Sequence, residues 1–361
     1  MVGYAGGTTT LMAPRTTDWS LALAVGAAFA TGLLSLVSGR PADWWVFALH
    51  GIIGLWLLPL VIWKLRRVKP RLLHPRAWDK RTWFALAATL LVLLALTTGI
   101  LWVAGVEFVL AGYHLLNWHI VFGIVLVVAT SAHMLARARP MRIREIRDRR
   151  TILRWGLVLV GAALTWNVQQ VGQRVLGWRG AERRFTGSYE RASYTGNAFP
   201  TVSWVADRPQ PIAPDDWRLA ITGAVAQPQT LTRADLLAWD DELDVILDCT
   251  GGFYSAQIWR GVLVGRLLEQ AVPTDAARFV SFVSVTGYRW SLPLAEARSA
   301  LLATHLGGEP VSHGHGAPAR LVAPGRRGFE WVKWVVELRV LTAPDDGQLA
   351  AIYTSSLSSG Q

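Results

Sequence analysis

The chain has 361 residues, of which 52% are hydrophobic and only 17% are charged, and this is too apolar for one soluble domain. A formal net charge of +11 is compatible with nucleic acid binding, but the basic residues are grouped between long apolar segments. A membrane explains that grouping better, and we expect no nucleic-acid partner. The single cysteine, Cys249, excludes an intramolecular disulfide and leaves one thiol for a metal.

Five apolar segments in the first half are each long enough to cross a hydrocarbon layer, which takes about 20 residues. They are predicted at 19–37, 44–63, 83–104, 115–135 and 152–176. The fifth becomes less apolar toward its end. Residues 1–17 lack a basic start followed by an apolar core, so no ordinary signal peptide is expected. We therefore predict a transmembrane five-helix bundle over residues 1–176.

The loops between these segments differ in charge. Those after the second and fourth segments are rich in Arg and Lys, whereas the opposite loops hold only Arg40, Asp43 and Glu107 as charges. Basic loops stay inside, so we predict a multi-pass protein of the cell membrane with a cytoplasmic amino terminus and everything after about residue 177 outside. The sequence RRTILR at 149–154 has the form of a twin-arginine export signal. The alternative is a plain cluster of positive charge.

Three histidines lie within the predicted spans, His50 in the second and both His119 and His133 in the fourth. Ionisable groups at such depth are costly unless they have a partner, so each is a functional candidate. His50 and His119 lie at similar depth on parallel spans and are predicted to ligate one haem iron from both sides. His133 lies nearly four turns after His119 on almost the same side of the helix, which makes a second haem possible. A hydrogen-bonded histidine at the inner interface is the alternative for His133.

This histidine spacing resembles that of di-haem b-type cytochromes, such as the membrane subunits of hydrogenases. The resemblance implies haem b, one haem expected and a second possible. It makes a quinone or quinol the natural redox partner in the membrane.

The second half is predicted to be a mixed α+β domain rich in strands, because short β-branched runs alternate there with two short helical patterns. We assign residues 177–205 to a linker, 206–345 to this domain and 346–361 to a loose tail. The strands are expected near 220–221, 245–247, 279–285, 320–322 and 335–340. No internal repeat is apparent.

Cys249 follows the apolar run at 245–247, and Thr250, Gly251 and Gly252 come directly after it. A strand that ends in a glycine turn lets a ligand approach the sulfur closely, which suits a soft metal ligand. A lone cysteine is, however, more often a small buried hydrophobic residue. After the turn, Val262, Leu263, Leu267 and Leu268 are spaced like one face of a helix.

Several separate segments between residues 197 and 340 add to this pattern. They are GNAFP at 196–200, WRLAITGAV at 217–225, LTRADLLA at 231–238, DCTGGF at 248–253, W-x-G at 259–261, VTGYRWSLPLAEA at 285–297, LLATHLGGEPV at 301–311 and HGAPARLVAPGRRGFEWVKWV at 315–335. In order and spacing they resemble the molybdopterin-binding domain of the sulfite oxidase superfamily. The resemblance implies oxygen-atom transfer at a molybdenum held by the Cys249 thiolate and the dithiolene of one pterin.

The resemblance also nominates residues by position. Thr250 and Asn197 are expected beside the pterin, and the closing segment is expected to bind its phosphate. The phosphate candidates are His315, Arg320, Arg326 and Lys333. Tyr288 and Arg289 are candidate catalytic residues. Thr286 stands where the family often has an acidic residue before Gly-Tyr, which leaves the substrate side open.

Two substrate classes and one different function remain open. An anion pocket for sulfite or another oxyanion would draw on Arg260, Arg289, Arg326 and Arg327. Tyr254 and Tyr288 would instead serve a neutral oxide, as in the periplasmic methionine sulfoxide reductases of this superfamily. The alternative function is a haem-only electron-transfer or sensor protein of the membrane, whose outer domain is catalytically inactive.

Overall fold

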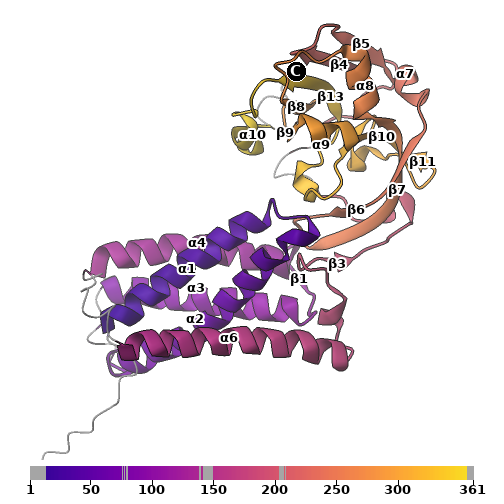
Figure 1. Cartoon of the computed structure of the whole chain (residues 1–361). Helices are drawn as coiled ribbons and strands as arrows, with labels where there is room; N and C mark the ends of the chain where they lie inside the picture. Colours follow the sequence, from indigo (N-terminus) through magenta and orange to yellow (C-terminus); the bar gives the residue numbers. More distant parts are fainter. Residues whose placement is uncertain are drawn as a thin grey trace, which may run out of the picture. The chain divides into compact units, whose positions relative to one another are not determined.

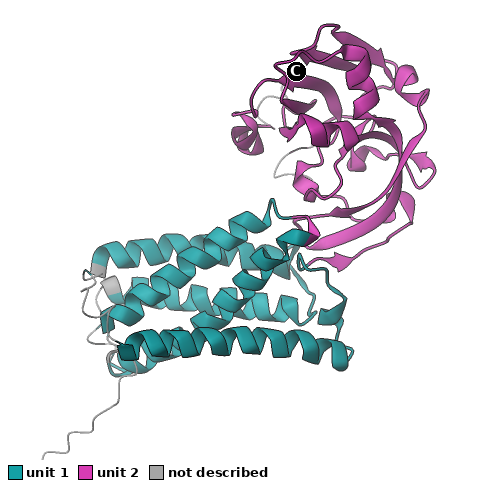
Figure 2. Cartoon of the chain, in the orientation of Figure 1, with its two compact units in different colours: residues 1–38, 42–187 teal, residues 39–41, 188–361 magenta. Residues whose placement is uncertain are grey.

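The computed structural model describes residues 14–74, 76, 78, 80–137, 140, 149–202, 207 and 209–355. The chain divides into two compact units, residues 1–38 with 42–187 and residues 39–41 with 188–361 (Figure 2). The division after Gly187 falls inside the predicted linker, whose last three residues lie outside the described part, as do residues 1–13 and most of the basic loop at 138–148.

The first unit is a helical bundle (Figure 1). Its long helices are α1 (Pro14–Ser35), α2 (Trp44–Leu72), α3 (Lys80–Val103), α4 (Leu115–Arg137) and α6 (Arg149–Val175). Among the described residues these are five helices long and apolar enough to cross a membrane, which confirms the five predicted segments. A small hairpin of β1 (Val109–Leu110) and β2 (Tyr113–His114) joins α3 to α4.

The helices pack as two hairpins, α1 with α2 and α3 with α4, while α6 packs mainly on α2. In the α6–α2 contact, Trp166 lies so close to Gly51 that a Cβ there would come within 3.0 Å of the indole. The buried core between the helices is aliphatic. It consists of Ala24, Val25, Ile53, Leu57, Leu60, Val61, Val92, Ala95 and Leu126.

The polar end of α6 has a structural explanation. The Gln173 side chain donates to the Val103 carbonyl at 3.0 Å, at the end of α3. Arg183, just after the turn η3 (Arg179–Glu182), donates to the side-chain oxygens of Gln173 at 2.7 Å and Gln170 at 2.8 Å. Gln173 therefore satisfies a carbonyl at the end of a neighbouring helix, and Gln170 helps to hold Arg183.

The second unit contains two sheets. In the five-stranded sheet the order is β5 (Gln229–Thr232), β4 (Arg218–Gly223), β13 (Val335–Leu341), β8 (Phe279–Ser284) and β9 (Arg289–Pro293), with only β4 and β13 parallel. In the six-stranded sheet β11 (Glu309–Pro310), β10 (Leu301–Leu306), β7 (Phe253–Leu263) and β3 (Tyr189–Glu190) form one path. Strand β12 (Arg320–Val322) pairs with β10, and β6 (Asp241–Asp248) pairs with β7. The predicted mixed α+β domain and its strand positions are confirmed.

Two local expectations were wrong. Residues up to Leu263 belong to β7, because that strand pairs along its length with β6 and β10, and helix α8 (Val264–Ala271) begins only afterwards. The expected loose tail contains helix α10 (Gln348–Thr354), whose Gln348 side chain accepts from the Ser291 backbone at 3.0 Å and hydroxyl at 2.8 Å. The remaining helices are α7 (Arg233–Leu237) and α9 (Leu294–Ser299).

Candidate functional site

The turn between β6 and β7 presents the thiol of Cys249. The Cys249 amide donates to the Phe253 carbonyl at 2.8 Å, and the Gly252 amide donates to the Cys249 carbonyl at 3.1 Å. Gly252 has φ +92°, a conformation that favours glycine. The Gly251 amide points at the sulfur, 3.3 Å from Sγ. The predicted glycine turn is therefore present, and its backbone fixes the place of a buried sulfur.

A buried ion pair supports this turn from behind. Arg327 donates to Asp248 Oδ1 at 2.6 Å and to the Cys249 carbonyl at 3.4 Å, and Ser188 donates to the same carboxylate oxygen at 2.7 Å. Gly328 lies so close that a Cβ on it would be 3.1 Å from the Cys249 Cα. The turn η6 (Gly328–Glu330) thus packs directly on the cysteine.

We expect Arg327→Ala to destabilise the second unit by about 3–5 kcal/mol, because it leaves the Asp248 carboxylate buried without its guanidinium. Arg339→Ala is the matched control. It breaks the more exposed pair with Glu337 and should cost at most about 1 kcal/mol. Thermal unfolding of the full-length variants measures both effects, and equal shifts would contradict the structural role of the buried pair.

Arg320 is a fully buried cation beside the thiol. Its guanidinium lies 5.0 Å from the ring centroid of Trp259 and 5.8 Å from that of Trp331, and it donates to the His315 carbonyl at 2.8 Å. Its Nε has no hydrogen-bond partner among the described residues. Burial lowers the pKa of Arg320 to about 9, although the Cys249 sulfur nearby raises it. A buried guanidinium without a carboxylate is costly, and this pattern favours an anionic ligand.

Lys333 is a second cation near Cys249, and His315 lies next to both Lys333 and Arg320. The Lys333 ammonium donates to the carbonyls of Val202 at 2.9 Å and Gly314 at 2.6 Å. His315 Nε2 donates to the Phe199 carbonyl at 3.1 Å, so its Nδ1 is the acceptor for the Ser312 hydroxyl at 2.7 Å. Burial, then Arg320 and Lys333, lower the pKa of His315 to about 4, and this histidine is neutral at pH 7.

Burial and repulsion from Arg320 lower the pKa of Lys333 from 10.5 to about 7. Below pH 7 the lysine is charged in both folded and unfolded chains, and the folded state bears the full cost of the buried charge. Between pH 7 and 10.5 only the unfolded chain keeps the proton, so this cost disappears as the pH rises. Lys333→Met should therefore stabilise cofactor-free protein more at pH 6.5 than at pH 9.5. A stability gain that is independent of pH in thermal melts would contradict this.

Asp207 is a buried carboxyl group that sequence reasoning missed. Burial raises its pKa, while hydrogen bonds from Ser355 and Thr286 and the charge of Lys333 lower it. Its Oδ1 has no hydrogen-bond partner in the part of the chain that the structure describes. Thr286, noted above as a departure from the family pattern, therefore contacts a carboxyl group from elsewhere in the chain. Asp207 lies in a stretch without periodicity, which gave no signal.

Tyr288 lies near this carboxyl group but is already engaged. Its hydroxyl donates to the Phe329 carbonyl at 2.7 Å. Burial, with Glu330 and Asp207 nearby, raises the pKa of Tyr288, so its hydroxyl keeps the proton at neutral pH. Tyr288 thereby holds η6 in place against Cys249.

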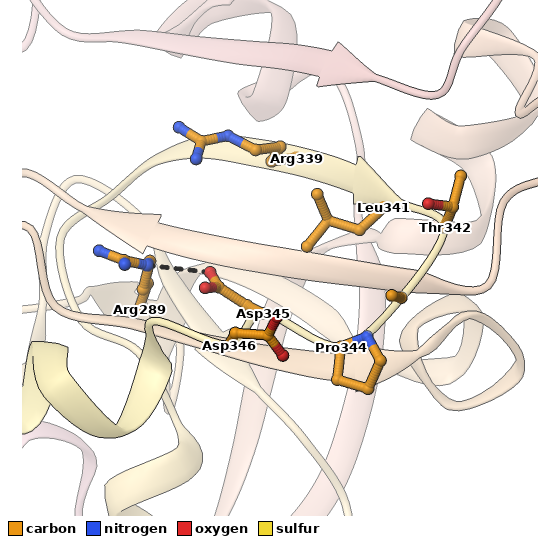
Figure 3. A pocket seen from close by; sticks show the side chains of 8 residues that line it. Arg289, Arg339, Leu341, Thr342, Pro344, Asp345 and Asp346 are labelled. Carbon is orange, nitrogen blue, oxygen red and sulfur yellow. Dashed lines mark hydrogen bonds and ion pairs between the residues drawn. The ribbon is translucent and has the colours of Figure 1, made fainter.

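Other nominated residues have different partners. Arg289 pairs with Asp345 at 2.9 Å and lines a surface pocket of about 270 Å³ together with Arg339 (Figure 3). Arg326 pairs with Glu296 at 2.5 Å and Glu330 at 3.0 Å. The structure thus gives both arginines carboxylate partners, and neither joins the cluster formed by Cys249, His315, Arg320 and Lys333.

Asn197 bonds to the serine that contacts His315, and Thr250 is the neighbour of Cys249 in the chain. Asn197 donates to the Pro310 carbonyl at 3.0 Å and accepts from the Ser312 amide at 2.8 Å. It therefore positions the serine that holds His315. Thr250 is half-buried in the cysteine turn, directly after Cys249.

The first unit contains a second candidate site. The rings of His50 on α2 and His119 on α4 lie 5.9 Å apart between centroids and are inclined at 83°. His50 Nδ1 donates to the Ala28 carbonyl at 3.0 Å and His119 Nδ1 donates to the Ala95 carbonyl at 2.9 Å. A carbonyl only accepts, so in both rings Nδ1 carries the proton and Nε2 keeps its lone pair. The predicted pairing of these histidines across two helices is present in the structure.

The candidate inner site at His133 is less complete. His133 is half-buried on α4. On α2, Lys64 and Arg67 both pair with Asp18 of α1, the arginine at 2.6 Å, and His74 Nδ1 donates to the Pro70 carbonyl at 2.7 Å. Lys64, Arg67 and His74 are therefore engaged with other partners.

Comparison with known proteins identifies the second unit. Residues 206–349 match the family model described as oxidoreductase molybdopterin binding domain. This region is a molybdopterin-binding oxidoreductase domain. The resemblance of the region to the sulfite oxidase superfamily is thereby confirmed, and the first unit lies outside the match.

The relatives of this molybdopterin domain carry different names. It is 32% identical over 142 residues to the protein-methionine-sulfoxide reductase catalytic subunit MsrP of Xanthomonas campestris, covering 34% of this chain and 44% of the relative. Over 172 residues it is 28% identical to the NADPH nitrate reductase of Beauveria bassiana, and the match covers 38% of this chain and 19% of the relative. The crystal structure of the sulfane dehydrogenase SoxCD of Paracoccus pantotrophus matches at 26% identity with a TM-score of 0.36. The match covers 37% of this chain and 40% of that chain. The chain spans less than half the length of each.

Proposed function

We propose that the chain is a membrane-bound molybdenum oxidoreductase that transfers an oxygen atom at Cys249 and exchanges electrons with the quinone pool through haem b. The observation that carries the proposal is a buried thiol with the charges of Arg327, Lys333 and Arg320 nearby. Arg320 is fully buried with no carboxylate partner among the described residues, and it lies beside the thiol. Nothing in a plain hydrophobic core would require that charge.

The side chains of this cluster fit a molybdopterin. The cofactor brings a phosphate and a dithiolene, both anionic, and guanidinium and ammonium groups are suited to bind them. We assign Arg320 and Lys333 to these anions, and we assign the Cys249 thiolate to the metal. When bound, the cofactor supplies two-electron oxygen-atom chemistry. Burial raises the pKa of the Cys249 thiol, while the Gly251 amide, Arg327 and Lys333 oppose the rise. Metal binding therefore displaces a proton from Cys249.

A neutral S-oxide is the substrate class that we favour. Of the arginines nominated for an oxyanion pocket, Arg289, Arg326 and Arg327 are each paired with a carboxylate. A carboxylate partner offsets the charge that would attract an oxyanion to these three arginines, and Arg260 lies on β7 opposite His305. A sulfoxide needs only a hydrogen-bond donor. The reaction consumes two electrons and two protons and yields a sulfide and water. Asp207, a carboxyl with a raised pKa beside Thr286, is suited to deliver a proton. The MsrP relative is consistent with this class.

The helical unit would then supply the electrons. Large apolar side chains are exposed along its helices, among them Val128 at 66% and Leu157 at 72%, and lipid is the solvent in which such a surface is stable. Haem b at His50 and His119 fits two neighbouring imidazoles whose Nε2 atoms keep their lone pairs. A second haem would use His133. The amino terminus would be cytoplasmic and the molybdopterin domain outside, with RRTILR acting in twin-arginine export.

Replacing Arg320 with methionine tests the cofactor assignment. Loss of one charged hydrogen bond, worth about 1.5–3 kcal/mol, should weaken cofactor binding by about 10- to 150-fold. The cofactor-free variant should be as stable as the parent or more so, because a costly buried charge is removed. Arg289→Met, at the surface pocket, is the control and should keep its molybdenum. Elemental analysis of the purified proteins measures the outcome. Full molybdenum content in Arg320→Met would contradict the assignment.

A haem-only electron-transfer or sensor protein is the competing function. It would have no use for a thiol on a glycine turn or for an unpaired guanidinium beside it. Purified protein with iron but no molybdenum would decide in its favour. Sulfite oxidation with haem reduction, and no S-oxide reduction, would instead favour the oxyanion class.

A further inference from the structure

The two helical hairpins of the first unit contain the same sequence pattern. Ala-x-x-Thr-Gly-Leu-Leu at 28–34 on α1 corresponds to Ala-x-x-Thr-Gly-Ile-Leu at 95–101 on α3. In each hairpin the second helix then carries His-x-x-x-Gly, at 50–54 on α2 and at 119–123 on α4. The expectation of no internal repeat was therefore wrong for this unit. The signal was hidden because all four helices have similar apolar compositions.

The repeated threonines make the same contacts. Thr31 Oγ1 donates to the carbonyls of Ala27 at 2.8 Å and Ala28 at 2.9 Å, and it lies 3.0 Å from His50 Nδ1. In the second hairpin, Thr98 Oγ1 bonds to the carbonyls of Leu94 and Ala95, and it lies 3.5 Å from His119 Nδ1. In both hairpins one alanine carbonyl thus accepts from the threonine and from the histidine.

The repeated glycines provide the space for the imidazoles. A Cβ on Gly32 would lie 3.6 Å from His50 Cε1, which is ordinary contact. A Cβ on Gly99 would lie only 2.9 Å from His119 Cε1, which is closer than real Cβ atoms approach. Glycine is therefore required beneath His119, whereas a methyl group at position 32 would fit beneath His50.

We infer that the two hairpins build one haem site of pseudo-twofold symmetry, in which Thr31, Thr98 and Gly99 are positioning residues for the two axial imidazoles. The inference rests on the haem of the proposed function. In each half the threonine and the alanine carbonyl fix the tautomer and the rotation of one ring, and Gly99 leaves the space that His119 needs.

Substitutions in both halves test the inference in the full-length protein. Gly99→Ala should reduce haem content on the order of tenfold, the usual cost of disturbing an outer-shell contact, while Gly32→Ala should retain haem. Alanine has a higher helix propensity than glycine, so α3 itself should stay helical. Thr31→Val and Thr98→Val should each change the low-spin ferric EPR spectrum and the haem midpoint potential, and serine at either position should restore both.

The matched control is Thr89→Val on α3, which removes the same kind of bond, from Thr89 Oγ1 to the Ala85 carbonyl at 2.8 Å. The symmetric site is wrong if Thr31→Val and Thr98→Val leave the EPR spectrum and the midpoint potential as unchanged as this control does. It is also wrong if only one of the two variants changes them. If the parent contains no haem, the haem part of the proposed function fails, and the inference falls with it. These two failures are distinguished by the spectrum of the parent.

Discussion

Cys249→Ser is expected to remove oxygen-atom transfer while the spectrum of the helical unit stays unchanged. The turn itself should survive, because the bonds that close it join backbone atoms of Cys249, Gly252 and Phe253. The exchange replaces a soft thiolate, which suits molybdenum, with a hard hydroxyl whose proton is far more difficult to displace. Since disturbance of an outer-shell partner costs about 10- to 100-fold in activity, loss of the ligand itself should cost at least as much.

Three measurements on the same preparation make this prediction sharp. Turnover is followed with methyl viologen as donor, which bypasses the helical unit, while molybdenum and iron are quantified separately. Cys249→Ala serves as a second variant, since alanine offers no oxygen to the metal. Parental turnover in the serine variant would overturn the role of Cys249. Loss of both molybdenum and haem would indicate misfolding, and the ligand assignment would then rest on the alanine variant.

The sequence predicts best those features that depend on neighbours along the chain. The run at 245–247 followed by two glycines predicts a strand, a turn and a buried thiol, and all three occur. Helix spans are equally local, because apolar composition over some 20 residues decides them. The pairing of His50 with His119 was predicted from their similar depth in two parallel spans, and depth depends only on the position of a residue within its own helix.

Pairing between distant residues was predicted much less well. Arg326 and Arg327 are adjacent and chemically identical, yet one faces Glu296 and the other Asp248. Nothing within a few residues distinguishes them, since the choice depends on which face of η6 packs on the cysteine turn. Asp207 was missed for the same reason. Its partner Thr286 lies on a turn far along the chain, so the contact between Thr286 and this carboxyl group is visible only in three dimensions.

His119→Ala and His50→Ala are each expected to remove the proposed haem between α2 and α4, because its iron would lose one of two axial imidazoles. Quinol-dependent turnover should fall to background, while turnover with methyl viologen persists at the molybdopterin domain. His114→Ala is the control, since His114 is exposed on β2. Quinol-dependent activity without this haem would show that electrons enter by another route.

His133→Ala then decides the number of haems. With a single haem at His50 and His119, this variant keeps the parental ratio of iron to molybdenum. With two haems it loses half of the iron, and the remaining spectrum belongs to the His50–His119 site alone. The single-haem outcome is the expected one. Lys64, at the level of α2 where a second ligand would be needed, is paired with Asp18, and an ammonium in an ion pair has no lone pair to offer iron.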